Sequence, residues 1–276
     1  MKQNKLTLLP PAPTAQAKSS QPAPRFKPGD RVMPIFAQSW TAGPPAMADI
    51  ASSLGGIIDG VFRQHAVFNE QGLVAVPHHL SYEEAASLPC AAVTAWNALY
   101  HGSKPLRVGD TVVTQGTGGV SVFVTLFALK AGARVIGTTS SAGKAEKLKK
   151  MGVQHVINYK ENPEWGMVVQ QLTAGRGAQY VVEVGGPGTL KQSGISAGLN
   201  GEIGIVGALG GVGETVGLHE IMCATRRVSV GDRVMFEEMN RAMEVAGIRP
   251  VVDGKVFGFE KMREAYRYFE KQGLVE

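Results

Sequence analysis

The sequence predicts an α/β fold in which a parallel sheet carries helices on both faces, preceded by a smaller region of short strands. Two observations support this fold class. After Gly109, short β-branched runs alternate with stretches whose apolar residues recur at helical spacing. Such alternation is typical of βαβ units and therefore of a parallel sheet. The 276 residues, 44% of them hydrophobic, are also enough to bury a large core.

The predicted elements follow one another in a simple order. The early chain reads as short strands: a turn and strand at 27–36, a strand at 60–68, and a strand leading into a helix at 72–89. The sheet is expected to contain strands at 111–115, 134–138, 155–158, 179–184 and 202–206, with helices between them, the first of these at 120–131. The final stretch, 256–273, reads as a strand turning into an amphipathic helix.

A glycine turn lies between the first strand of this sheet and its helix. Gly116, Gly118 and Gly119 follow the β-branched run directly, and Ser121 replaces the third glycine of the dinucleotide fingerprint. A side chain at Gly116 or Gly118 would hold a pyrophosphate away from the backbone N–H groups and the helix N-terminus. The pattern favours a dinucleotide site, and the alternative is a tight turn in a generic α/β unit.

The end of the second strand indicates which cofactor would bind. NAD sites usually carry a carboxylate about 20 residues after the glycines, where it holds the ribose 2′-hydroxyl. No Asp or Glu occurs over 133–145, and the strand runs instead into hydroxyl residues and Lys144. These groups suit a 2′-phosphate, so NADP(H) is favoured. The alternative is that Lys144 only begins the exposed face of the next helix.

Composition excludes several classes of function. The net charge is +5, but the basic residues are scattered, which argues against nucleic-acid binding. Cys90 and Cys223 lie far apart without a CxxC pair, which indicates a reducing, cytoplasmic setting and no structural zinc. The six histidines show no metal-binding spacing, and no apolar run reaches the roughly 18 residues needed to span a bilayer. Residues 1–25, rich in Pro, Ala, Ser and Gln, are expected to be extended or disordered.

Several separated motifs carry a resemblance to a known family. They are KPGDRV at 27–32, EEAASLPCAAVTAWNAL at 83–99, VGDTVVTQGTGGVS at 108–121, ARVIGTTSSAGKAEKLKKMG at 133–152, HVINY at 155–159, VVEVGG at 181–186, IVGALGG at 205–211, VGDRVMFEEM at 230–239 and FEKMREAYRYF at 259–269. In this order the chain resembles the medium-chain dehydrogenase/reductase superfamily, in its zinc-independent quinone oxidoreductase and alcohol-dehydrogenase-like branch.

The resemblance implies a doubly wound Rossmann sheet together with a partial, truncated GroES-like β domain. It divides the chain into an N-terminal segment at 1–25, a partial substrate domain at 26–95, an NADP-binding domain at 96–235 and a returning segment at 236–276. It also implies a homodimer formed through sheet edges, for which 227–236 (RVSVGDRVMF) is a candidate edge strand.

The resemblance also assigns cofactor contacts by position. Gly116, Thr117, Gly118, Gly119 and Val120 would hold the pyrophosphate, and Ser140, Lys144 and Tyr159 would hold the 2′-phosphate. Tyr159 could alternatively be a half-buried strand aromatic.

Two further loops are assigned to the nicotinamide. The first contains Gly207, Ala208 and Leu209, and the second contains Val230 and Gly231. Without the rest of the pattern, both loops could equally be ordinary glycine turns. No catalytic side chain is assigned.

Metal binding and the front of the chain depart from the family pattern. Cys90 stands where zinc-dependent relatives have a catalytic ligand, but no partners complete a ligand set, so a structural cysteine and no metal are expected. His65 is expected to be a structural strand histidine. The family places a long stretch between its opening strand, which 1–13 resembles, and the KPGDRV motif. That stretch and a closing strand after 276 are missing, and they would supply much of the substrate site.

Two functions remain open on these grounds. The first is an NADPH-dependent oxidoreductase that transfers hydride to a carbonyl, enone or quinone, a small-molecule substrate, with no membrane or nucleic-acid partner. The second is a truncated, catalytically impaired relative that binds NADPH as a binding or regulatory module. A different α/β protein that binds ATP or flavin is a third, weaker alternative.

Overall fold

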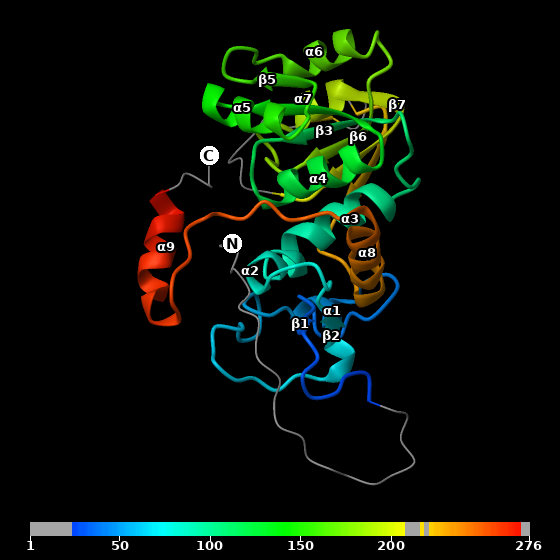
Figure 1. Cartoon of the computed structure of the whole chain (residues 1–276). Coiled ribbons are helices and arrows are strands. Elements are labelled where there is room, and N and C mark those ends of the chain that lie inside the picture. The colour runs from blue at the N-terminus through cyan, green and yellow to red at the C-terminus, as the bar shows by residue number, and fades with distance from the viewer. Residues whose placement is uncertain (1–23, 208–215, 218–220, 272–276) are drawn as a thin grey trace. The chain divides into compact units, whose positions relative to one another are not determined.

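The computed structural model describes residues 24–207, 216–217 and 221–271. The chain forms two compact units (Figure 1). Unit 1 holds the chain up to Gly109 together with 123–133 and 227–250, and unit 2 holds 110–122, 134–226 and the chain from 251. The prediction for residues 1–23 lies outside the described residues.

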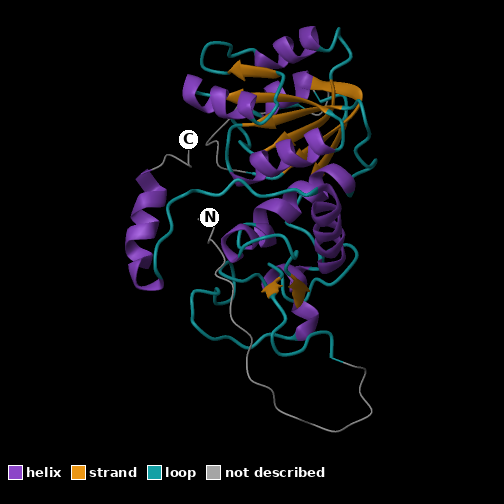
Figure 2. Cartoon of the chain, in the orientation of Figure 1, coloured by secondary structure: helices purple, strands orange, loops and turns teal. Residues whose placement is uncertain are grey.

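A six-stranded sheet in unit 2 forms the predicted α/β fold (Figure 2). Its strands are β3 (Thr111–Gln115), β4 (Arg134–Thr139), β5 (His155–Asn158), β6 (Ala178–Glu183), β7 (Ala197–Ile205) and β8 (Ala224–Arg227). Their order is β5-β4-β3-β6-β7-β8, and the pairs from β5 to β7 are parallel. This is the doubly wound order, in which the chain steps outward to one side from the first strand and then to the other. The Rossmann prediction is therefore confirmed.

Helices cover both faces of this sheet. The helices that connect its strands are α4 (Gly119–Lys130), α5 (Ala142–Lys150), α6 (Trp165–Leu172) and α7 (Leu190–Ser196). Trp165 and Val169 of α6 pack on Ile136 in one hydrophobic cluster. The next residue of β4, Gly137, faces Leu148 of α5, because neighbouring strand residues point to opposite faces.

Unit 1 contains a much smaller β-structure. Strands β1 (Val32–Pro34) and β2 (Leu73–Ala75) form an antiparallel pair, which confirms two of the predicted early strands. The helices of this unit are α1 (Met47–Ala51), α2 (Tyr82–Ala85), α3 (Val93–Tyr100) and α8 (Arg233–Ala246), and a π-helical turn at Leu88–Ala92 leads into α3.

Three predicted strands are wrong. Residues 60–68 form no strand, and His65 is exposed there. The expected edge strand at 227–236 is not formed: only Arg227 belongs to a strand, the end of β8, and α8 begins at Arg233, where the Asp232 side chain accepts a hydrogen bond from the Met235 amide. The stretch before the C-terminal helix is not a strand either, although α9 (Met262–Lys271) confirms the helix. Within the described chain, no helix is both long and apolar enough to cross a membrane.

Candidate nucleotide site

The glycine turn after β3 leaves open space above its backbone. Gly116 has φ +70°, a conformation that only glycine adopts without strain. A Cβ added at Gly116 or at Gly118 would meet no atom within 4 Å. Helix α4 starts at Gly119, and the first N–H groups of a helix have no partner inside the helix. The turn therefore has the room and the donors that a pyrophosphate needs.

Ser121 explains the departure from the glycine fingerprint. Its side chain is 1% exposed, and its Oγ donates a 2.6 Å hydrogen bond to the Gln115 carbonyl oxygen. The hydroxyl thus links the first turn of α4 to the end of β3, which are the two ends of the glycine turn. Of the other residues assigned to this turn, Val120 is buried and Thr117 is half-buried.

The candidate 2′-phosphate residues follow the two neighbouring strands, β4 and β5. Ser140 comes directly after β4, and Tyr159 comes directly after β5. The Tyr159 amide donates to the Thr139 carbonyl oxygen over 3.0 Å, so the two strand ends lie side by side. Lys144 is half-buried in the first turn of α5. The structure therefore brings the three predicted residues to one edge of the sheet.

The neighbouring hydroxyl groups are already engaged or buried. Ser141 is the N-cap of α5, and its side chain accepts a 3.3 Å hydrogen bond from the Lys144 amide. Thr138 and Thr139 are 2% and 0% exposed. Tyr159 is half-buried and packs against the hydrophobic cluster, as the alternative interpretation expected of its ring. Ser140 and Lys144 are half-buried as well, so each remains partly accessible at this edge.

The loop after β6 contains polar residues that the sequence interpretation missed. Glu183, the last residue of β6, is fully buried and accepts hydrogen bonds from the Gly186 amide at 2.7 Å and Thr189 Oγ1 at 2.6 Å. Gln115 Nε2 donates to the same carboxylate at 2.8 Å. The available signal was a glutamate inside the otherwise apolar run VVEV.

The chain after β7 passes closely over this loop. The Gly207 amide donates to the Glu183 carbonyl oxygen at 3.2 Å, and a Cβ at Gly207 would lie 1.9 Å from the Val184 carbonyl oxygen. Only glycine fits this approach, so Gly207 adjoins the loop after β6. The predicted contacts Ala208 and Leu209 lie outside the described residues.

Val230 and Gly231, the second loop assigned to the nicotinamide, lie in unit 1 and are held there by α3. Asn97 Nδ2 donates to the carbonyl oxygens of Val230 at 3.0 Å and Ser229 at 3.2 Å. A Cβ at Gly231 would lie 2.6 Å from Val93 Cγ2, so the segment packs directly on this helix. Asn97 is a further residue that sequence reasoning did not single out.

Cys90 is a free cysteine, and burial raises the pKa of its thiol to about 11. The described residues contain no cluster of three or more His, Cys, Asp or Glu side chains that could hold a metal ion.

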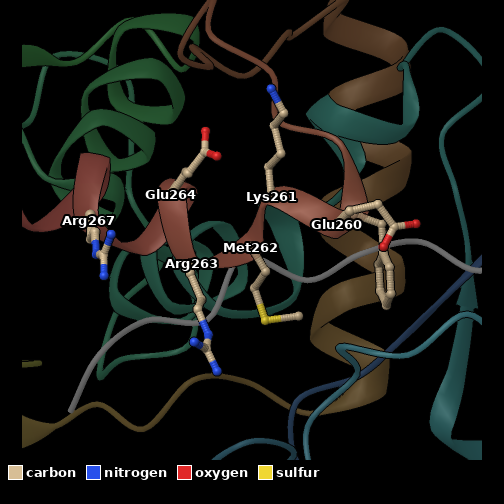
Figure 3. A pocket seen from close by; sticks show the side chains of 7 residues that line it. Glu260, Lys261, Met262, Arg263, Glu264 and Arg267 are labelled. Carbon is tan, nitrogen blue, oxygen red and sulfur yellow. The ribbon is translucent and has the colours of Figure 1, made fainter.

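A surface hollow lies on the C-terminal helix (Figure 3). Its lining residues are Phe259, Glu260, Lys261, Met262, Arg263, Glu264 and Arg267. Lys261 and Glu264 project to one side of the ribbon, and Met262 and Arg263 project to the other. None of these residues belongs to the strand ends described above.

Comparison with known proteins identifies the family. Residues 119–246 match the family described as zinc-binding dehydrogenase. The chain is 42% identical to a zinc-type alcohol dehydrogenase-like protein of Schizosaccharomyces pombe, over 91% of this chain and 74% of that protein. The chain therefore belongs to the medium-chain dehydrogenase/reductase superfamily, and it is an oxidoreductase of that family.

Two further similarities agree with this assignment. A putative alcohol dehydrogenase from Sinorhizobium meliloti 1021, known from a crystal structure, has 36% identity and a TM-score of 0.83, over 90% of this chain and 73% of that one. A 2-methylene-furan-3-one reductase of Solanum lycopersicum is 31% identical over 73% of this chain and 47% of its own length. Each of these proteins shares the family with the present chain.

Proposed function

We propose that the protein is an NADPH-dependent reductase of small carbonyl, enone or quinone compounds and that it works without zinc. The observation that carries the proposal is the edge formed by the ends of β3, β4 and β5. There an open glycine turn adjoins Ser140, Lys144 and Tyr159, and no acidic residue occurs over 133–145. A 2′-phosphate would find a cation and a hydroxyl at this edge, whereas a 2′-hydroxyl would lack its usual carboxylate.

The glycine turn fits the pyrophosphate of such a cofactor. The positive φ of Gly116 and the empty space at Gly116 and Gly118 allow phosphate oxygens to reach the backbone. The N-terminus of α4 adds the positive end of a helix dipole. Lys144 would add a charge-assisted hydrogen bond to the 2′-phosphate.

The chemistry of reduction would be supplied by the cofactor when it is bound, as a hydride from the nicotinamide. The residues of the chain would bind the cofactor and orient it. In the proposal, Gly207, Ala208 and Leu209 line the nicotinamide, and Val230 and Gly231 meet its carboxamide. The proton comes from solvent or from a side chain of the protein, and Cys90 takes no part.

The substrate class rests on the family and on one relative. The tomato relative is named as a reductase of 2-methylene-furan-3-one, which supports an enone among the candidate substrates. Carbonyl and quinone compounds are proposed from the same family resemblance. We also propose a cytoplasmic homodimer, since both cysteines are free and β8 lies at an edge of the sheet.

A second candidate function is supported by the small size of the β1–β2 sheet. The strands have three residues each. A relative with a reduced substrate region could bind NADPH and turn over poorly, as a binding or regulatory module.

One experiment separates the two functions. The purified chain is titrated with NADPH and NADH by calorimetry, and NADPH oxidation is then followed with a panel of quinones, enones and aldehydes. NADPH-selective binding with turnover supports the reductase, and selective binding without turnover supports the binding module. Failure to bind either nucleotide would contradict both.

A further inference from the structure

A buried polar network joins the end of β3 to the loop after β6. Its centre is the Glu183 carboxylate, which is 0% exposed and has no ion-pair partner among the described lysines and arginines. Four groups donate to it: the Gly186 amide, Thr189 Oγ1, Gln115 Nε2 and Ser193 Oγ. A buried carboxylate is tolerated when hydrogen bonds replace its lost water. Here the donors come from β3, from α7 and from the loop between β6 and α7.

Gln115 completes the network from the other side. Its Oε1 accepts hydrogen bonds from the amides of Val184 and Gly185, each at 3.1 Å. Its Nε2 also donates to Ser193 Oγ at 2.8 Å. Gln115 and Glu183 together therefore hold three successive amides, those of residues 184–186, in fixed positions.

The same glutamine stands at the base of the glycine turn. It immediately precedes Gly116, and its carbonyl oxygen accepts the hydrogen bond from Ser121 Oγ. Gln115 thus resists displacement of the loop at 184–186 and also starts the turn proposed to bind the pyrophosphate.

The sheet order assigns different halves of a dinucleotide to the two sides of β3. In a doubly wound sheet, the ligand crosses the carboxyl ends at the point where strand order reverses, here between β3 and β6. The proposed 2′-phosphate residues follow β4 and β5, so the adenosine half would lie on that side. The loop after β6 is left to the nicotinamide half.

We infer that Gln115 and Glu183 form a buried latch that positions loop 184–186 beneath the nicotinamide half of the cofactor. The latch residues touch neither substrate nor cofactor and are positioning residues. The inference rests on the proposed function, since it specifies how that site aligns its cofactor. Small displacements of a reacting ring reduce hydride transfer steeply, whereas the adenosine half is anchored elsewhere.

The test uses Glu183→Gln, which keeps the shape of the side chain and turns two acceptor oxygens into one acceptor and one donor. We expect affinity for adenosine 2′,5′-bisphosphate to stay within about twofold, while kcat for NADPH oxidation falls about tenfold or more. Glu202→Gln is the matched control, because Glu202 is also buried in this sheet but pairs with Arg226 at 3.0 Å. It should lose no more stability than Glu183→Gln and should retain kcat.

A swapped pair provides the rescue. In Gln115→Glu/Glu183→Gln, the new carboxylate can accept from the amides of Val184 and Gly185, and the new amide can donate to it. Every hydrogen-bonding group then has a partner again, so we expect most of the lost kcat to return. A single variant and a swapped pair that are equally impaired would overturn the latch, because general damage to the core is not reversed by exchanging polarity.

A measurement on the cofactor-free protein tests the latch independently of the proposed function. Amide hydrogen exchange at residues 184–186 of the ligand-free protein should accelerate in Glu183→Gln and slow again in the swapped pair. Thr189→Val, which removes one donor, should give a smaller acceleration if Glu183→Gln fails to fold. Unchanged exchange in the folded variants would overturn the latch. If wild-type protein binds no NADPH, the proposed function fails, and exchange alone then decides whether the latch holds the loop.

Discussion

The sheets of the two units differ in how completely they are built. Every residue of β3 in unit 2 is buried, as are five of the six residues of β6. In unit 1, β1 and β2 have three residues each, and apolar side chains such as Ile57 and Val67 are 63% and 97% exposed. The parallel sheet of unit 2 thus has its own core, whereas the β-structure of unit 1 is small.

This difference predicts which part of the chain should determine cofactor binding and which should determine substrate binding. The proposed cofactor contacts depend on strand ends that a hydrophobic core fixes in place. In the proposal, substrate contacts depend on the part of the chain with few strands. Variants in the glycine turn should therefore change the affinity for the cofactor without destabilising the fold.

The largest effect is expected from Gly118→Val. A Cβ at Gly118 would meet no atom of the described residues within 4 Å, so the thermal unfolding temperature should change little. In the complex it would occupy the place of the pyrophosphate, and affinity for both NADPH and NADH should fall by at least about 100-fold, or about 2.7 kcal/mol. Calorimetry measures both affinities. Gly143→Ala, also in open space but outside the turn, is the matched control, and retained affinity in Gly118→Val would rule out this turn as the phosphate site.

Lys144→Ala should discriminate between the two cofactors. Loss of one charge-assisted hydrogen bond weakens NADPH by about 1.5–3 kcal/mol, and NADH should bind as before. The difference should shrink at high salt, because salt screens exposed charges. Lys147→Ala, an exposed lysine of the same helix, provides the control. Equal losses for NADPH and NADH would contradict the 2′-phosphate assignment.

Ser141→Ala should reduce stability more than binding. It removes the N-cap of α5, which typically costs about 1 kcal/mol. Ser141→Asp should keep the cap, yet its charge beside Ser140 should disfavour NADPH relative to NADH. Thermal unfolding and calorimetry together distinguish these two effects. An unstable Asp variant with unchanged cofactor preference would contradict this account of the strand end.

The smallest effect is expected from metal removal. Catalytic zinc normally has three protein ligands, and the described residues hold no cluster that could complete a ligand set around Cys90, so the protein should not retain zinc. Dialysis against a chelator should leave NADPH affinity, any turnover and the unfolding temperature unchanged. Stoichiometric zinc in the purified protein, measured by elemental analysis, would contradict this expectation.

The sequence predicted the sheet well because its signals are local. The bounds of β3 and β5 agree to the residue, since β-branched runs are interrupted by turns at both ends. The strand predicted at 60–68 failed because a strand needs a neighbour with which to exchange hydrogen bonds, and alternation alone does not provide one. At 227–236 the overlooked signal was Asp232, an N-cap residue directly before a helical run.

The sequence indicated individual residues of the candidate site, but it did not predict the hydrogen bonds that connect its parts. Ser140, Lys144 and Tyr159 were found from position and chemistry, and the structure brings them to one edge of the sheet. Glu183 and Gln115 were missed, because they lie 68 residues apart and their hydrogen bond forms only when β3 and β6 pair. Asn97 was missed for the same reason, since its partners Ser229 and Val230 are distant in sequence.

By itself, the sequence determined the α/β class, the family and the position of the glycine turn, because each depends on residue type and short-range spacing. Only the tertiary structure decided which hydroxyl caps a helix, which threonines are buried, and how Gln115 and Glu183 join two strand ends. The physical reason is that hydrogen-bond partners of buried polar groups are chosen by strand order and packing, which bring together residues that spacing along the chain leaves far apart.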